Sequence, residues 1–368
     1  MSDQILYPKL ISDALATVRY PGSGKNLVEA GMVEDDIRID GNKVSFSLLF
    51  DKPTDPFMKS VVKAAEAAIH TFASNDAEVT VNVKTRKAAA PQKSDPLPGV
   101  KNIIGISSGK GGVGKSTVAA NLAVALAREG YKVGLLDADI FGPSIPKMFG
   151  VEDEQLYMHE VDGVNKIIPV ERFGVKLLSI GFLVDRDSPV VWRGSMASNA
   201  LKQLIEQGDW GELDYFLIDM PPGTSDIHLT LVQTLGITGV VIVSTPQQVA
   251  LADARKGLAM FADEKINVPV LGIVENMAWF TPEEHPDERY YIFGNGGAAR
   301  LAEELHVKLL ACIPLVASVG KHSDEGEPIA AGDTLAGQAF IHLAHEVIDA
   351  VDKRNRELPP TIHVQVKK

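Results

Sequence analysis

Cysteine is almost absent from this sequence: Cys312 is the only one among 368 residues, so no disulfide can form within the chain. Long apolar runs are also missing, since stretches such as "GVVIVS" at 239–244 are far shorter than the roughly 20 residues that a membrane-spanning helix needs. Basic residues are outnumbered, with 36 Lys and Arg against 48 Asp and Glu, which gives a formal net charge of −12. Such an acidic balance argues against general binding of nucleic acid.

Sorting signals are not visible either. The first residues, "MSDQILYPKL", contain no basic stretch followed by an apolar one, so we expect no signal peptide. Hydrophobic residues make up 45% and charged residues 23% of the sequence, as in a globular protein. We therefore expect a cytoplasmic protein that has neither a membrane nor nucleic acid as a partner. The lone Cys312, within "LLACIPL", is expected to be a small buried hydrophobe.

The length of the chain favours two domains. The segment "AAAPQKSDPLPG" at 88–99 has three prolines and no apolar periodicity, which is typical of a linker. We therefore predict a small α+β domain over 1–87 and a larger α/β domain over 100–356. The remaining tail, 357–368, is expected to be loose or to form a short edge strand.

The small domain has clear element signals. Apolar residues at helical spacing predict helices around 11–18 and 61–72. Two alternating runs around an Asp-Gly turn predict a β-hairpin over 35–50. Alternating valines at 79–83 predict a final strand. These elements together indicate an α+β fold.

The larger domain shows short apolar runs separated by helical stretches. Most of the runs lack alternation, as expected for strands buried on both faces of a parallel sheet. The predicted strands are 102–106, 133–136, 176–180, 215–218, 239–243, 270–274 and 308–313. The predicted helices between them include 116–129, 196–207, 249–262 and 297–305. This order predicts a doubly wound, mostly parallel α/β sheet, whose ligand binds beyond the carboxyl ends of the strands.

A phosphate-binding loop follows the first of these strands. The segment "GKGGVGKS", Gly109 to Ser116, fits G-x-x-x-x-G-K-[ST] between a strand and a helix. Glycines let backbone N–H groups face phosphate oxygens, and the helix N-terminus attracts anions. Lys115 is predicted to neutralise the β- and γ-phosphates, and Ser116 to hold Mg²⁺. The predicted nucleotide-binding residues of this loop are Gly109, Lys110, Gly111, Gly112, Val113, Gly114, Lys115, Ser116 and Thr117.

Aspartates stand at the ends of two other predicted strands. Asp137 and Asp139 occur in "VGLLDADIFGPS", and Asp219 occurs in "YFLIDMPPGTSD". One carboxylate at such a position can bind Mg²⁺ through water, and a second can orient the attacking water. A single aspartate after a strand is often only a cap or turn residue. Three of them behind a phosphate loop favour one shared catalytic site.

Several segments resemble one family closely. "KGGVGKST", "LLDADIFGPS", "LIDMPPGTSD", "STPQQVALADARKGLAMF" and "IVENMAWF" look like the Mrp/ApbC family of iron–sulfur cluster carrier ATPases, within the MinD/ParA-type ATPases with a deviant Walker A loop. The resemblance covers roughly residues 100–350, and the first domain resembles a small iron–sulfur-assembly domain. It implies ATP, Mg²⁺ and a [4Fe–4S] cluster as cofactors. It also implies a homodimer whose clients are iron–sulfur apoproteins or assembly proteins.

The resemblance also implies a role for the first lysine of the loop. In this group the first lysine of "KGGVGK" crosses the homodimer interface and contacts the partner's ATP, and Lys110 matches that position. A cation supplied in this way stabilises charge in the transition state and couples hydrolysis to dimerisation. The alternative is that Lys110 is a solvated loop lysine.

Other roles follow from the same resemblance. Asp139 would orient the hydrolytic water, and Asp137 and Asp219 would support Mg²⁺. Asn276, in "ENM", would read the adenine, and Pro314, in "CIPL", would lie near the base. The predicted catalytic residues are therefore Lys110, Lys115, Asp139 and Asp219.

One feature of the family is missing. In many members a Cys-x-x-Cys pair follows the "ENM" segment, and two subunits bridge a [4Fe–4S] cluster. Here "ENMAWFTPEEHPDERYYIFGNGG" contains no cysteine, so no iron–sulfur ligands are identified and direct cluster binding is in doubt. Glu283, Glu284, His285 and Asp287 could hold Zn²⁺, Fe²⁺ or Mn²⁺, or form a solvated loop.

Three functions are therefore compatible with the sequence. The first is an ATPase in iron–sulfur cluster assembly or transfer. The second is a cluster-free switch in which ATP controls the binding of partners. The third is a positioning ATPase of ParA or MinD type, which needs an amphipathic membrane helix or a basic DNA-binding face, and "PPTIHVQVKK" provides neither.

Overall fold

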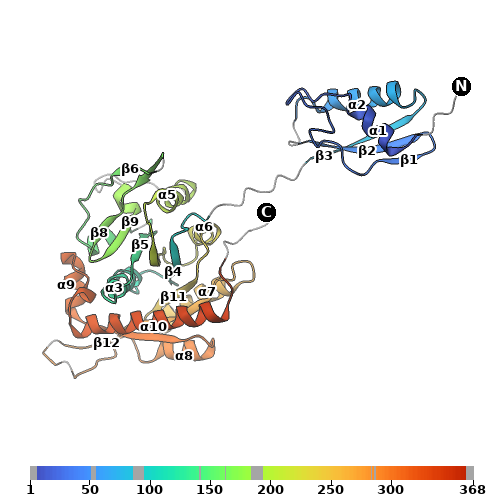
Figure 1. The fold of residues 1–368 in the computed structure, drawn as a ribbon. Coiled ribbons are helices and arrows are strands. Elements are labelled where there is room, and N and C mark those ends of the chain that lie inside the picture. Colours follow the sequence, from blue (N-terminus) through green and yellow to red (C-terminus); the bar gives the residue numbers. More distant parts are fainter. Residues whose placement is uncertain are drawn as a thin grey trace. The chain divides into compact units, whose positions relative to one another are not determined.

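The computed structural model describes residues 6–50, 55–85, 95–140, 142–161, 163–183, 194–282, 284–285 and 287–361. The chain divides into two compact units, Met1–Lys93 and Ser94–Lys368 (Figure 1). Much of the predicted linker at 88–99 and the last residues of the predicted tail, 362–368, lie outside the described residues. Within the linker range, Leu97 is buried in a hydrophobic cluster of the second unit.

The first unit is an α+β fold with a three-stranded sheet. Its elements are α1 (Pro8–Leu15), β1 (Arg38–Asp40), β2 (Lys43–Phe50), α2 (Met58–Phe72) and β3 (Glu78–Thr85). The strand order is β1-β2-β3, with β1 antiparallel and β3 parallel to β2. The predicted hairpin forms, and Gly41 in its turn has a φ of 57°, which glycine adopts without strain. Ile11, Phe46 and Ile69 are fully buried between the helices and the sheet.

Asp36 ties three segments of this unit together. Its carboxylate accepts hydrogen bonds from the Ser47 amide at 2.9 Å and the Ser47 hydroxyl at 2.6 Å. Lys84 Nζ on β3 lies 3.0 Å from Asp36 Oδ2. These donors, the Ser47 hydroxyl first, lower the pKa of Asp36 from 3.8 to about 2. The folded unit therefore favours the ionised carboxylate.

We expect this carboxylate to make the first unit sensitive to acid. Because the folded pKa lies below the unfolded value, its stabilising contribution is complete above pH 3.8 and is lost as the pH falls towards about 2. Asp36→Asn should remove most of this pH dependence and lower stability at neutral pH by about 1 kcal/mol at most, since the pair is partly exposed and screened. Urea titrations followed by the NMR signals of β2 at several pH values test this. Asp40→Asn, at an exposed position, is the matched control.

The second unit is built on an eight-stranded sheet in the order β13-β12-β11-β4-β10-β5-β9-β8. These strands are β4 (Val100–Ser108), β5 (Val133–Asp137), β8 (Val170–Arg172), β9 (Val175–Ser179), β10 (Leu213–Asp219), β11 (Gly239–Ser244), β12 (Val270–Phe280) and β13 (Leu309–Leu315). All neighbours are parallel except β8 and β9, which are antiparallel at one edge. This confirms the predicted α/β class with a mostly parallel sheet.

Helices cover both faces of this sheet. They are α3 (Lys115–Arg128), α4 (Ile145–Met148), α5 (Gly194–Gln207), α6 (Asp226–Thr234), α7 (Gln248–Ala262), α8 (Gly297–Glu304), α9 (Ala317–Glu325) and α10 (Leu335–Glu357), with short 3₁₀ helices at Ile180–Leu183 and Ile329–Ala331. One core cluster joins the sheet to α3 and α10, and the other joins it to α5, α6, α7 and α8. Among the helices described, none is both long and apolar enough to cross a bilayer.

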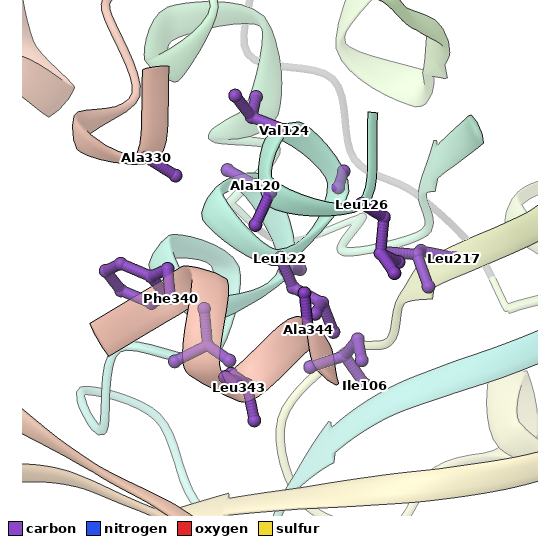
Figure 2. Packing of buried hydrophobic residues seen from close by; sticks show 14 of the residues in the cluster. Ile106, Ala120, Leu122, Val124, Leu126, Leu217, Ala330, Phe340, Leu343 and Ala344 are labelled. Atoms are coloured by element: carbon purple, nitrogen blue, oxygen red, sulfur yellow. The ribbon is translucent and has the colours of Figure 1, made fainter. Parts of the chain in front are cut away.

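The helix that follows the phosphate loop is buried on nearly every side. Figure 2 shows α3 enclosed by β4, β10 and α10, with Leu122 and Leu126 close to Ile106 and Leu217. A helix that is apolar all round belongs in a core, and the alanines of α3 permit close packing. The start of α3, and with it the phosphate loop, is therefore held by rigid surroundings.

The structure also contains a hairpin and a strand extension that the sequence patterns did not predict. The hairpin β6 (Met158–Val161) and β7 (Val164–Ile167) lies outside the main sheet, and β12 runs to Phe280, beyond the predicted end at 274. The extension of β12 continues into residues that pair with β13 and with Tyr290. The end of β12 is therefore determined by pairing with residues later in the chain, which local sequence patterns do not show.

Candidate functional site

The loop between β4 and α3 has the geometry of a phosphate cradle. Gly112 and Gly114 have φ values of 81° and 79°, in the left-handed region that favours glycine. A Cβ at Gly109 would lie 2.1 Å from the backbone of Asp253 on α7. A Cβ at Gly114 would lie 2.2 Å from Asn276 Nδ2. The glycines therefore serve both the turn and the close packing beneath it.

Lys115, the first residue of α3, joins the predicted catalytic aspartates. Its Nζ lies 2.6 Å from Asp219 Oδ1, 3.5 Å from Asp139 Oδ2 and 3.2 Å from Ser116 Oγ. Its side chain is only 6% exposed. The structure thus brings together residues from three separate segments, as the sequence motifs predict.

A cleft of about 230 Å³ opens above this cluster. Its lining combines P-loop residues, Lys110 among them, with Asp139, Met148 and Pro222 from other segments. The full lining is Ser108, Lys110, Gly111, Gly112, Gly114, Lys115, Ser116, Thr117, Asp139, Ser144, Met148 and Pro222. Two lysines and a helix N-terminus make this cleft suitable for a polyphosphate.

Asp219 lies at the carboxyl end of β10, completely buried beside the P-loop. Burial raises the pKa of its carboxyl, and the nearby Lys115 ammonium opposes that rise. Among the described residues, its Oδ2 has no hydrogen-bond partner. An unpaired buried oxygen is costly unless a ligand completes it, so Asp219 fits a role in holding Mg²⁺ or its bound water.

Asp137, one strand away, has both oxygens occupied. Its Oδ1 accepts from the Asp139 amide at 3.1 Å, and its Oδ2 accepts from the Ser179 hydroxyl at 2.9 Å and the Ile145 amide at 3.3 Å. Burial and the charge of Asp219 raise the pKa of Asp137 to about 8. Asp137 therefore holds the segment that carries Asp139, and has less capacity for a metal than Asp219.

Asn276 and Pro314 are close to each other on neighbouring strands, since Asn276 of β12 pairs with Ile313 of β13. The Asn276 amide donates to the Val113 carbonyl at 2.8 Å and so braces the P-loop from below. Pro314 lines a separate cavity of about 420 Å³ together with Trp279. The brace between Asn276 and the loop was missed at the sequence level, because no local signal connects positions so far apart.

Cys312 differs from the expected small buried hydrophobe. It is half-buried and lines the same cavity as Pro314. Burial, with the charge of Glu275, raises the pKa of the thiol, so the thiolate that a metal needs is disfavoured. The thiol is half-exposed because it borders this cavity, whose lining also includes Leu335 and Ala339 of α10, and does not pack into a continuous core.

The acidic segment after β12 is only partly described, since Glu283 and Pro286 lie outside the described residues. His285 Nδ1 lies 3.9 Å from Glu288 Oε1, and Tyr290 donates to Glu288 Oε2 at 2.5 Å. Within the described ranges, no group of three or more His, Cys, Asp and Glu side chains is arranged to hold a metal ion.

Comparisons with known proteins agree with this geometry. The family model described as a NUBPL iron-transfer P-loop NTPase matches residues 99–348, and the one described as an iron–sulfur cluster assembly protein matches residues 9–81. An iron–sulfur cluster carrier protein of Synechocystis sp. is 43% identical over 349 residues, covering 93% of this chain and 98% of the relative. Another, from Aquifex aeolicus, is 48% identical over 262 residues, covering 70% of each chain.

A solved structure extends the likeness to three dimensions. A nucleotide-binding protein from Archaeoglobus fulgidus, in complex with ADP, is 42% identical with a TM-score of 0.55, covering 63% of this chain and 89% of that one. The matches confirm the resemblance stated from the motifs and the ATPase activity that it implies. This chain belongs to the family of NUBPL iron-transfer P-loop NTPases, with an N-terminal unit of the iron–sulfur cluster assembly type.

Proposed function

We propose that this protein hydrolyses Mg-ATP as a cytoplasmic homodimer and acts in the assembly of iron–sulfur clusters or their transfer to apoproteins. The carrier proteins that it resembles across nearly its whole length support the iron–sulfur role. The observation that carries the ATP-dependent part is the buried bond between Lys115 and Asp219 at the floor of the P-loop cleft. The iron-transfer family match favours this function over a positioning ATPase.

The nucleotide would enter the cleft with its phosphates towards the start of α3. Lys115 then exchanges its carboxylate partners for the β- and γ-phosphates, and the loop amides surround the same oxygens. Ser116 and Asp219 would hold Mg²⁺, which supplies charge neutralisation for the phosphates when bound. Asn276 keeps the loop in shape, and the base would lie towards Pro314.

Hydrolysis would depend on Asp139, which lines the cleft close to Lys115. We assign to its carboxylate the orientation of the attacking water. Asp137 holds the Asp139 amide, which fixes the position of that carboxylate. Lys110, also on the cleft wall, would reach the nucleotide of the partner subunit and stabilise the charge of the transition state.

Asp139→Asn is expected to slow ATP turnover by about tenfold to a hundredfold while ATP affinity stays within about twofold. A water-orienting group acts mainly in the transition state, so binding is spared and ATP-bound dimers accumulate. Phosphate release, equilibrium titration with an ATP analogue and light scattering measure the three quantities. Asp349→Asn, on the exposed side of α10, is the control. Wild-type turnover in Asp139→Asn would assign the role elsewhere.

A second candidate is a cluster-free switch in which ATP binding controls the contact with assembly partners. It is favoured by the cysteine content, since one thiol per chain gives two per dimer and a [4Fe–4S] cluster takes four ligands. In this version the first unit would bind clients, and the cluster would pass between other proteins.

A further inference from the structure

The loop that follows Asp219 contributes Pro222 to the lining of the ATP cleft and is anchored to β4, the strand that precedes the P-loop. The Met220 amide donates to the Ile106 carbonyl at 3.0 Å, and the Gly223 amide donates to the Ser108 carbonyl at 2.9 Å. Pro222, between these anchors, lines the cleft. The first half of the loop is therefore fixed by backbone bonds to β4.

The second half of the loop ends at Ser225, the residue before α6. Its amide donates to Nδ1 of His228 at 3.2 Å, and the Ser225 hydroxyl lies 3.2 Å from the same nitrogen. His228 stands three residues into the helix and its own amide donates back to the Ser225 carbonyl at 3.0 Å. This is the place where Glu or Gln closes a capping box, and here an imidazole does so.

The imidazole is held in one chemical state. His228 is 1% exposed, and its ring packs edge-on against Phe261 of α7 at a centroid distance of 6.2 Å. Because a backbone N–H can only donate, Nδ1 must be the unprotonated acceptor. Burial, the foremost cause, lowers the pKa of His228 to about 4, so the ring is neutral at physiological pH.

We propose that His228 is a positioning residue for ATP hydrolysis, which fixes the loop from Pro221 to Ser225 through the bond between its Nδ1 and the Ser225 amide. Asp219 and the backbone bonds to β4 lie at one end of the loop and this bond lies at the other, so the loop that carries Pro222 is held at both ends. His228 itself does not reach the cleft lining, and it acts through the loop. The inference rests on the proposed ATP site and adds a residue that no motif contains.

The consequence is a specific kinetic signature. The P-loop and Lys115 do not depend on the Ser225 cap, so ATP binding should survive its loss. Without the cap, the loop from Pro221 to Ser225 is held less firmly. The groups that the transition state requires are then less well aligned, which lowers kcat. A lost neutral hydrogen bond corresponds to roughly a twofold to tenfold decrease.

The decisive experiment compares His228→Met with His228→Gln in the full-length protein. Met and Gln have the same length, but only Gln offers an oxygen to the Ser225 amide, as in an ordinary capping box. We expect His228→Met to lower kcat roughly twofold to tenfold with an unchanged Kd for an ATP analogue, and His228→Gln to retain wild-type kcat. Equal kcat values for the two variants, whether reduced or unchanged, would overturn the proposal.

A second measurement does not depend on turnover or on a folded Met variant. In the nucleotide-free wild type, hydrogen exchange of the Ser225 amide should be at least about tenfold slower than that of the amide of Thr224, an exposed residue. His228→Gln should keep this protection. A rapidly exchanging Ser225 amide in the wild type would refute the cap itself. Protection together with no ATPase activity would instead count against the proposed function.

Discussion

Lys115→Ala should lower the affinity for ATP by at least about a hundredfold and reduce hydrolysis to an undetectable level. The Lys115 ammonium is the cation at the floor of the cleft, and each charge-assisted bond to a phosphate oxygen contributes roughly 1.5–3 kcal/mol. Two such bonds correspond to roughly a hundredfold to ten-thousandfold. Titration with a fluorescent ATP analogue and phosphate release give the two quantities. Lys256→Ala, an exposed lysine of α7, is the control.

Lys115→Ala should also lower the stability of the folded protein, which loss of a phosphate contact alone would not do. In the nucleotide-free protein Lys115 is the ion-pair partner of the buried Asp219 and of Asp139. Its removal leaves a buried carboxylate without a cation, which typically costs about 3–5 kcal/mol in folding free energy. Adding Asp219→Asn should restore much of the stability and none of the ATP affinity. Wild-type affinity in Lys115→Ala would mean that the loop does not cradle phosphate.

The second prediction with a large effect is that the protein alone binds no iron–sulfur cluster. After anaerobic reconstitution with iron and sulfide, the protein alone should hold no stable [4Fe–4S] cluster of the kind that bridges two subunits. Thiolates hold such clusters, and the chain offers only Cys312, whose thiol pKa is raised. Mg-ATP should still bind and be hydrolysed by the same sample. Iron and sulfide analysis with visible absorption spectra makes the measurement.

The variant Cys312→Ser makes this result interpretable. Near-stoichiometric four-iron clusters per dimer in the wild type would contradict the prediction. If Cys312→Ser then lost them, the half-buried thiol would be a ligand. If Cys312→Ser kept them, the ligands would be oxygen, nitrogen or external thiols. A protein that remains free of iron while it turns over ATP would favour the partner-binding switch.

The meeting of Lys115 with Asp219 and Asp139 could be anticipated from the sequence because it depends on strand ends. β10 pairs with β4 and with β5, and Asp219 stands in register with Asp137. Residues that end parallel neighbours must meet at one edge of the sheet, so the motif order alone placed Lys115 among the aspartates. The buried strands were also readable, since their apolar runs are continuous.

Features that depend on contacts between distant segments could not be anticipated. Asn276 supports the P-loop through a carbonyl 163 positions earlier in the chain, at Val113. The occupied oxygens of Asp137 depend on Ser179 and Ile145, which no motif connects to it. The half-exposure of Cys312 follows from a cavity lined by residues of β12, β13 and α10, which a short apolar run does not reveal.

The pairing of Lys115 with Asp219 and Asp139 has a consequence for the rate of nucleotide exchange. In the absence of phosphate, the Asp219 and Asp139 carboxylates pair with the Lys115 ammonium. They therefore compete with the nucleotide for this cation. Product departure therefore creates no uncompensated charge, and no separate refolding of the floor is needed before the next ATP. Each arriving nucleotide must, however, displace a partner that is already in contact. The apparent affinity then reports the difference between two ion pairs, the one that Lys115 makes with the carboxylates and the one that it makes with phosphate.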